Sequence, residues 1–304
     1  MLQSSAPATA APSPIFSFEG VNNGDAVLPP DTNGDIGPNH YVQWVNLTFA
    51  VYSRSGSLLY GPAAGGTIWD GFGGPCESQN DGDPIVLYDE LADRWIMSQF
   101  AIPNRLFSFL FAPFYQCIAV SQTPDPTGPY HRYQYEFSKL NDYPKFGVWP
   151  DGYYMAINQF TAVNLQYAGQ GVVAFDRAAM LAGQPANMIY FDLADDLSLG
   201  GMLPSDLDGQ APPAGSPNYF AQADDDGMGY PAGRPDPIVA IPRRLGVAGL
   251  VDVHRAVSVA GRGLRLQHVR FRARVHPPAG HHGEDRCAVG PADVPAAVPK
   301  LRHP

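Results

Sequence analysis

Short runs of alternating apolar and polar residues, separated by turns rich in Pro, Gly, Asn and Asp, fill the chain as far as Tyr230. This alternation predicts β-strands, because successive side chains of a strand point to opposite faces of its sheet. Similar strings recur as "PNHYVQWVN" at 38–46, "DRWIMSQF" at 93–100, "PDGYYMAIN" at 150–158 and, more loosely, "PNYFAQAD" at 217–224. Their spacing of roughly 55–65 residues is somewhat longer than that of propeller repeats.

Each repeat has the same predicted internal order. A short strand containing Pro or Gly comes first, followed by a polar turn, an aromatic strand and two further strands joined by another turn. The third strands are predicted at 49–53, 117–121 and 171–175. Four consecutive antiparallel strands per repeat are typical of a β-propeller blade.

The sequence therefore predicts an all-β, β-propeller-like fold over residues 17–230. About three and a half four-stranded blades fit into this length, which is too few to close a ring. Such an incomplete propeller would leave edge strands open to aggregation. The alternative is a pair of β-sandwich domains, which would not explain why similar strings recur at similar positions.

The composition agrees with a turn-rich β-protein. Charged residues make up 16% of the chain and aromatic residues 12%, and there are 32 Gly and 31 Pro. A helical protein would instead be dominated by Ala, Leu, Glu and Lys.

The last quarter of the chain uses a different set of residues. Up to Tyr230 there are seven Lys and Arg against 24 Asp and Glu, whereas the remaining residues carry twelve against five. A basic nucleic-acid arm would use the arginines of this segment, and a zinc site would use its histidines and cysteine. The residues concerned are Arg262, Arg265, Arg270, Arg272 and Arg274 for the arm, and His276, His281, His282 and Cys287 for zinc.

A third interpretation of residues 231–304 is a shifted reading frame. With permitted codons, the same one-base shift at 238–246 and at 291–302 restores the aromatic, strand-like composition of the preceding chain. We favour this interpretation and expect a largely disordered tail, because an out-of-frame segment has no reason to carry periodic apolar faces. It predicts one inserted or deleted base near codons 227–237 of the gene, and no nucleic-acid partner.

The first 16 residues are rich in Pro and Ala, and we expect residues 1–16 to be a flexible linker. They lack the basic n-region and the apolar h-region of a signal peptide. No apolar run in the chain approaches the ~20 residues that a membrane helix needs. No membrane span is therefore expected.

Several long motifs resemble those of one protein family. They are "PPDTNGDIGPNHYVQW", "DPIVLYDELADRWIMSQF" and "YPKFGVWPDGYYM", and the match covers about residues 17–233. The family consists of large secreted bacterial proteins that look like β-propellers and are mostly uncharacterised. The resemblance implies a propeller-like fold and an extracellular or cell-surface location, and it supplies no catalytic residues.

Cys76 and Cys117 flank predicted strands, and the third cysteine, Cys287, lies in the tail. In a secreted protein, oxidation of the first two to a disulfide is favoured, and this bridge would stabilise the fold by ~4 kcal/mol through the loop that it closes. The alternative is a pair of free buried thiols. Their spacing does not match the CxxC motif of redox or metal sites.

Asp31, Asn33 and Asp35 stand at alternate positions and could open a calcium loop, since Ca²⁺ prefers carboxylate and amide oxygens. An EF-hand would also need Gly and Glu where this chain has Ile36 and Val42. We therefore predict a structural calcium ion outside the EF-hand class, which would pin the first blade. The alternative is a solvated turn whose side chains bind their own backbone. Further clusters of this kind are Asp81 with Asp83, and Asp224 with Asp225 and Asp226.

Residues 1–230 contain few signs of catalysis. A glycosidase-like propeller would need paired carboxylates, but the glutamates are scattered. His40 and His131 are accompanied by no nucleophile elbow, and the Gly clusters are followed by no helix that could form a phosphate loop. The glutamates are Glu19, Glu77, Glu90 and Glu136. No catalytic constellation is identified, so the sequence leaves open whether the protein is an enzyme.

Aromatic residues offer a second kind of function, the binding of sugars or peptides. Candidates for a binding platform are Trp44, Trp69, Trp149, Tyr153 and Tyr154. The alternative is that these rings pack between blades, as aromatic residues in strands commonly do. We expect a secreted or cell-surface module that binds an extracellular glycan or protein, or acts as a scaffold. The alternative is a carbohydrate-active enzyme.

Overall fold

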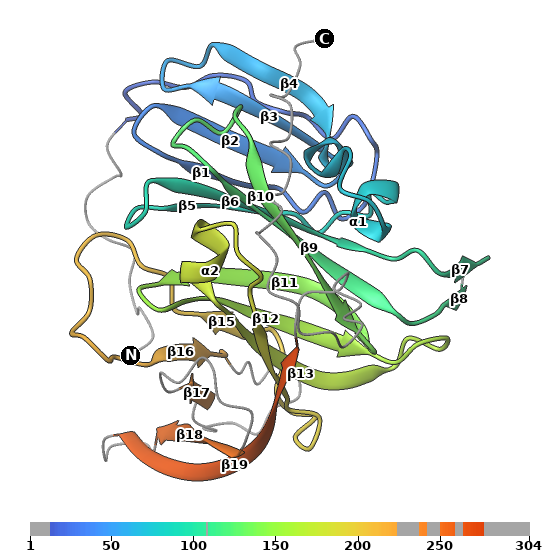
Figure 1. Ribbon diagram of the computed structural model, residues 1–304, viewed down its shortest axis with the longest axis vertical. Coiled ribbons are helices and arrows are strands. Elements are labelled where there is room, and N and C mark those ends of the chain that lie inside the picture. The colour runs from blue at the N-terminus through green and yellow to red at the C-terminus, as the bar shows by residue number, and fades with distance from the viewer. Residues whose placement is uncertain (1–12, 108, 224–236, 242–249, 259–263, 277–304) are drawn as a thin grey trace, which may run out of the picture.

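The computed structural model describes residues 13–107, 109–223, 237–241, 250–258 and 264–276. Within these ranges the chain consists mainly of antiparallel strands, which form sheets that follow one another down the molecule (Figure 1). The all-β prediction is confirmed.

The first two sheets have four strands each. The first sheet contains β1 (Asn33–Ile36), β2 (His40–Val45), β3 (Thr48–Ser53) and β4 (Leu58–Ala64). The second contains β5 (Ile85–Asp89), β6 (Arg94–Ala101), β9 (Phe114–Ser121) and β10 (Tyr130–Phe137). Between β6 and β9 the chain forms a separate hairpin of β7 (Arg105–Leu106) and β8 (Phe109–Leu110).

The third sheet begins in the same way with β11 (Leu140–Trp149), β12 (Gly152–Phe160), β13 (Tyr167–Phe175) and β14 (Met188–Asp192). It then continues through β19 (Leu264–His276), β18 (Leu250–Ser258), β17 (Pro237–Ile241), β16 (Asn218–Ala221) and β15 (Leu203–Pro204). Three short helical segments complete the described elements: η1 (Gly65–Trp69), α1 (Pro75–Ser78) and α2 (Arg177–Leu181).

The recurring strings form the second strand of each unit, namely β2, β6, β12 and β16. The predicted third strands fall within β3, β9 and β13. Residues of β6 and β12 are buried on both faces, because a neighbouring sheet or loop covers each side. The repeat in the sequence is therefore a repeat of strand position.

Part of the tail is described as strands. β17 pairs with β16 and β18, and β19 pairs with β14 and β18. The rest of residues 231–304 lies outside the described residues, as do residues 1–12 of the expected linker. The same holds for Asp224, Asp225, Asp226, Arg262, His281, His282 and Cys287. The shifted reading frame concerns the gene and stays a prediction.

Apolar side chains fill the spaces between successive sheets. Val42 and Trp44 of the first sheet pack with Trp95 and Met97 of the second, and all four are fully buried. Between the second and third sheets lies a larger cluster that includes Tyr135, Tyr153 and Phe175. Trp44, Trp69, Tyr153 and Tyr154 are at most 1% exposed, which confirms the packing interpretation for these rings.

Trp149 differs from the other rings proposed as a platform. It is half-buried and packs against a further apolar cluster in the third sheet, which includes Tyr154 and Phe220. Its indole N–H donates to the carbonyl of Ser216 at 3.0 Å. The Trp149 ring is therefore also used in packing.

The first strands of successive units lie side by side: β1 against β5, β5 against β11, and β11 against β15, the other edge strand of the third sheet. Side chains bridge them at their free edges. The backbone N–H groups of Val86 and Tyr88 in β5 donate to Asn33 Oδ1 at 2.6 Å and to Asp35 Oδ2 at 2.7 Å. The N–H of Val148 in β11 donates to Asp206 Oδ1 at 2.7 Å. Edge amides that no strand pairs with are thereby satisfied.

A buried ion pair joins the second sheet to the third. Asp89 at the end of β5 is fully buried, and Arg177 at the start of α2 approaches it with Nε to Oδ2 at 2.7 Å and Nη2 to Oδ1 at 2.9 Å. The hydroxyl of Tyr153 donates to the same Oδ2 at 2.8 Å. This two-pronged geometry compensates for the desolvation of the carboxylate.

The predicted disulfide is confirmed. Cys76 in α1 and Cys117 in β9 are bridged, with a Cα–Cα distance of 5.7 Å. The bridge fastens the loop between the first and second sheets onto β9, and the N–H of Cys76 donates to the Gln134 side chain of β10 at 3.2 Å.

Candidate functional site

A polar pocket of about 150 Å³ lies where the first strands of three sheets begin. Its walls come from the segment before β1, the segment before β5, and an irregular stretch within β11. The residues that line it are Asp31, Thr32, Asn33, Asp83, Pro84, Tyr143, Pro144 and Lys145. We call this the axial pocket.

The backbone around the axial pocket adopts unusual conformations. Asp31, Asp83 and Tyr143 have φ angles of 41°, 46° and 51°. Such angles are uncommon for residues other than glycine. They are all the more unusual for Asp83 and Tyr143, because each precedes a proline and a proline favours an extended backbone in the residue before it. The register of β11 against β12 shifts between Asp142 and Lys145. Tertiary contacts hold these conformations, and the N–H of Tyr143 donates to Asp83 Oδ2 at 2.9 Å.

Two carboxyl groups, those of Asp31 and Asp83, line the axial pocket, and the charge of Asp142 in β11 acts on both this pair and Lys145. Burial raises the pKa of Asp83 to about 6, and the nearby charges of Asp142 and Asp31 act in the same direction. Burial also raises the pKa of Asp31 and of Asp142. A side-chain hydrogen bond between Asp31 and Asp83 partly offsets this effect for Asp31. Asp83 therefore keeps its proton to a higher pH than an ordinary carboxyl group.

Lys145 provides the positive charge of the axial pocket. Its Nζ lies 3.7 Å from the centre of the Tyr143 ring, which is within the range of a cation–π contact. Burial lowers the pKa of Lys145, whereas the charges of Asp83, Asp31 and Asp142 raise it. With all four groups ionised, three negative charges face one positive charge, so the pocket favours a proton or a cationic group.

Asp31 and Asn33 of the predicted calcium loop both line the axial pocket, but the three residues of the loop have different hydrogen-bond partners. Asp31 faces the axial pocket, and its Oδ2 accepts from Asn46 Nδ2 at 3.1 Å. Asn33 and Asp35 use their side-chain oxygens on the edge of β5, as described above. Within the described part of the chain, no group of three or more His, Cys, Asp and Glu residues is arranged to hold a metal ion. Calcium binding stays a prediction.

Sequence reasoning missed Asp142, Tyr143 and Lys145. A signal was present, because "NDGDP" before β5 and "NDYPK" in β11 share an Asn-Asp pair followed by a proline. Asp83 in the first string was singled out as part of an oxygen cluster. No site residue is predicted in the matching string that contains Asp142.

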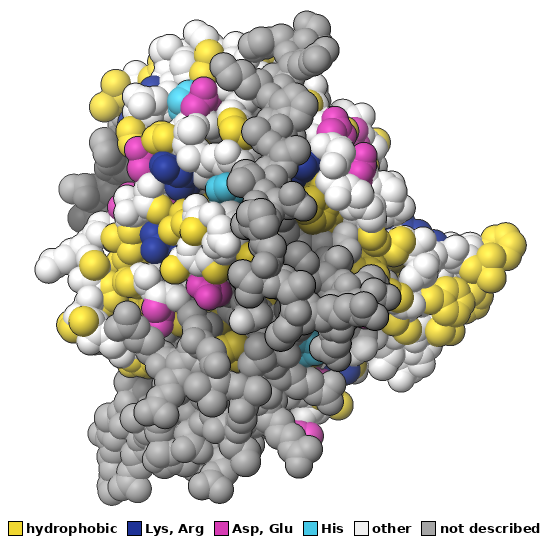
Figure 2. Space-filling model, viewed as in Figure 1, with side chains coloured by type: hydrophobic (Ala, Val, Ile, Leu, Met, Phe, Trp, Pro, Cys, Tyr) yellow, Lys and Arg dark blue, Asp and Glu magenta, His cyan; other side chains and the backbone are white. Residues whose placement is uncertain are grey.

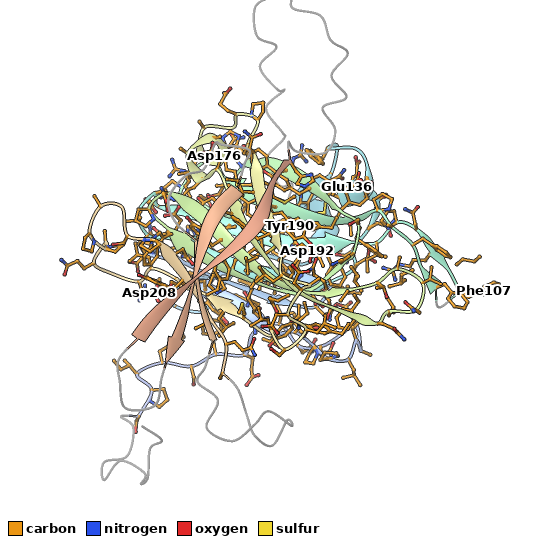
Figure 3. All side chains as sticks on the ribbon, turned by 90° about the horizontal axis from the view of Figure 1, so that it is seen from below. Phe107, Glu136, Asp176, Tyr190, Asp192 and Asp208 are labelled. Carbon is orange, nitrogen blue, oxygen red and sulfur yellow. A yellow bond between two sulfur atoms is a disulfide. The ribbon has the colours of Figure 1, made fainter. Side chains whose placement is uncertain are left out.

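A second acidic group lies at the opposite ends of the first strands. Burial raises the pKa of Asp35 and of Asp206, and the charge of Asp208 adds to both effects. Glu90 accepts from the N–H of Gly209 at 3.0 Å. In Figure 3, Asp208 lies across the molecule from Phe107, a residue on the pocket side.

The residues weighed as catalytic lie apart in the described structure. His40 begins β2 and approaches Asp125 at 3.9 Å, whereas His131 lies in β10 beside Gln122. Burial lowers the pKa of His131. Glu77 accepts from the N–H groups of two glycines in its own loop, which gives it a structural role.

Comparison of the chain with protein-family models, with curated proteins and with solved structures finds no match. The described helices include none that is long and apolar enough to cross a membrane. The axial pocket is therefore the feature on which a functional assignment depends.

Proposed function

We propose that the chain is a secreted or cell-surface ligand-binding or scaffold module on an incomplete β-propeller-like framework. Support for the framework comes from the four-stranded units, the adjacent first strands and the packing of sheet on sheet. Support for the location comes from the Cys76–Cys117 bridge, since disulfides persist in oxidising compartments, and from the resemblance of the motifs.

The observation that carries the proposal is the convergence of Asp31, Asp83 and Lys145 on one pocket, next to the charge of Asp142. These side chains come from three sheets, so the pocket forms only when the sheets are assembled. Carboxylates and an ammonium group can bind the hydroxyls of a sugar or the amino group of a peptide. Tyr143, which is 45% exposed, adds an aromatic surface beside them. The ligand is a glycan or a protein segment that carries hydroxyl or amino groups.

A binding screen tests this proposal. The full chain is applied to arrays of extracellular glycans and of lysine-containing peptides, beside the variants Tyr143→Ala and Lys145→Gln. Both variants should lose at least about tenfold in affinity, because each removes a contact in the pocket. Lys139→Gln, which breaks a surface pair with Asp192, is the control and should bind normally. Equal binding by all variants would refute the assignment of the pocket.

One observation favours the alternative of a carbohydrate-active enzyme. Burial raises the pKa of Asp83 to about 6, and a carboxyl group with a raised pKa can serve as the general acid of a glycosidase. Hydrolysis of aryl glycosides by the full chain would support this alternative if Asp83→Asn and Asp31→Asn lost the activity. Asp195→Asn should retain it, since Asp195 is an exposed residue outside the pocket.

A further inference from the structure

The β7–β8 hairpin carries large apolar side chains away from the body of the protein. Phe107 is 93% exposed, Leu106 is 57% exposed and Phe109 is 47% exposed. Figure 2 shows hydrophobic side chains gathered at this projecting end, and in Figure 3 Phe107 lies at the extremity of the molecule. Phe111, just after β8, is 37% exposed.

The turn between β12 and β13 lies beside this hairpin. The N–H of Val163 donates to the carbonyl of Leu110 at 2.7 Å, which ties the two loops together. Val163 is 45% exposed and Leu165 is 37% exposed. We name the six exposed side chains the apolar tip: Leu106, Phe107, Phe109, Phe111, Val163 and Leu165.

Contacts at its base hold the apolar tip in its projecting position. Arg105 forms an ion pair with Asp81 and donates from Nε to the carbonyl of Ile102 at 3.0 Å. The N–H of Phe111 donates to the carbonyl of Asn104 at 2.9 Å. Soluble proteins seldom keep such a cluster of apolar side chains in water unless it meets another surface.

We infer that the apolar tip inserts into the surface of a lipid bilayer. Its side chains are hydrocarbon without a polar end, whereas protein–protein hot spots are rich in Trp, Tyr and Arg and poor in Leu and Val. Sugar platforms likewise use aromatic rings that are supported by polar groups. A bilayer accepts a convex apolar projection without needing a complementary groove.

The distribution of charge supports a membrane as the partner. In a chain with a formal net charge of −10, residues 102–113 and 161–166 contain no Asp or Glu and only one charged residue, Arg105. The loops that would meet the headgroups are therefore free of carboxylates. The acidic remainder of the chain would be repelled by anionic lipids, so the inference is specific for a zwitterionic surface such as phosphatidylcholine.

The apolar tip lies at the same end of the sheets as the axial pocket. β6 and β12 end where β5 and β11 begin, because each pair is antiparallel. Insertion of the tip would therefore turn the axial pocket towards the membrane surface. The inference does not depend on the ligand of that pocket, and either can hold without the other.

Sedimentation of the full chain with phosphatidylcholine vesicles tests the inference. The chain should bind, and Phe107→Ser should weaken the partition at least about tenfold, because a largely exposed Phe side chain then has little apolar surface to insert. Leu58→Ser is the matched control. Leu58 is 52% exposed at the start of β4, at the other end of the sheets, and its replacement should leave binding unchanged.

A second measurement covers the case in which Phe107→Ser disturbs the hairpin. In Phe107→Trp the added indole should show a blue-shifted emission when vesicles are added, and in Leu58→Trp it should not. The inference is overturned if the full chain stays in the supernatant, or if both serine variants lose binding equally. It is also overturned if Phe107→Ser abolishes self-association in sedimentation velocity while vesicles bind neither chain, since the tip would then contact a second copy.

Discussion

Replacement of Asp83 by asparagine should stabilise the protein at neutral pH and leave it almost unchanged at pH 4. The Asp83 carboxyl group has a pKa of about 6 in the fold, against 3.8 for the ordinary group, with burial as the main cause. As the pH rises from about 4 to 6, the unfolded chain loses this proton before the folded chain does. The protonated Asp83 therefore stabilises the fold fully below the pKa of the unfolded chain, 3.8. This stabilisation is lost once the pH passes the pKa of the folded chain, about 6.

The size of the effect follows from the two pKa values. A difference of about two units corresponds to about 3 kcal/mol of unfolding free energy at most. Asp83 is only half-buried, so solvent screening weakens the effect, and we expect about 1–2 kcal/mol. Asparagine resembles the protonated carboxyl group, because it can accept from the N–H of Tyr143 and donate to Asp31.

Urea unfolding at several pH values between 4 and 7.5, followed by tryptophan fluorescence in the presence of a chelator, measures this effect. The stability of Asp83→Asn relative to the unaltered chain should rise with pH and level off above about pH 6. Asp195→Asn, at an exposed position, is the control and should show no such rise. A variant that is less stable at pH 7.5, or a difference that does not vary with pH, would refute the reasoning.

Three further predictions concern the ion, the bridge and the buried pair. Calcium added after chelation should raise the Tm of the chain by about 2–4 °C per kcal/mol of binding but leave Asp31→Asn unaffected, and unchanged melting of the unaltered chain would count against a calcium site. Reduction of the Cys76–Cys117 bridge should lower the unfolding free energy by about 4 kcal/mol through its loop of 41 residues, as measured by urea unfolding with and without reductant. Arg177→Ala should lower it by about 3–5 kcal/mol, because Asp89 would remain buried without its partner, and a loss below about 1 kcal/mol would contradict this role.

Local patterns predicted the strands well. The strings that end at Asn46 and Phe100 form β2 and β6. Strand formation could be predicted there because the alternation of side chains between the two faces of a sheet is a local property of the chain. The helical segments α1 and η1 were not predicted. They are short turns held by contacts to other sheets, as with the Cys76–Cys117 bridge, and four or five residues carry no helical period that could be read.

The acidic residues show where local reasoning stops. Asp31, Asn33 and Asp35 have the same pattern whether they bind an ion, a turn or a neighbouring strand. The structure places the last two on the N–H groups of Val86 and Tyr88, because the free edge of β5 runs alongside β1. The role of Asn33 and Asp35 is therefore set by β5, a strand about 50 residues farther along the chain, whose free edge supplies their hydrogen-bond donors.

The sequence by itself determined the β-class, the order of strands within each unit and the pair of cysteines that is bridged. These properties follow from residue alternation, turn residues and the chemistry of cysteine. Each of these can be read from residue types over short stretches of chain. Only the tertiary structure decided that Asp31, Asp83 and Lys145 share one pocket, and that Phe107 projects from the same end of the sheets. The physical reason is that sheet stacking sets which strand ends meet, and burial among those ends sets the charge of each group.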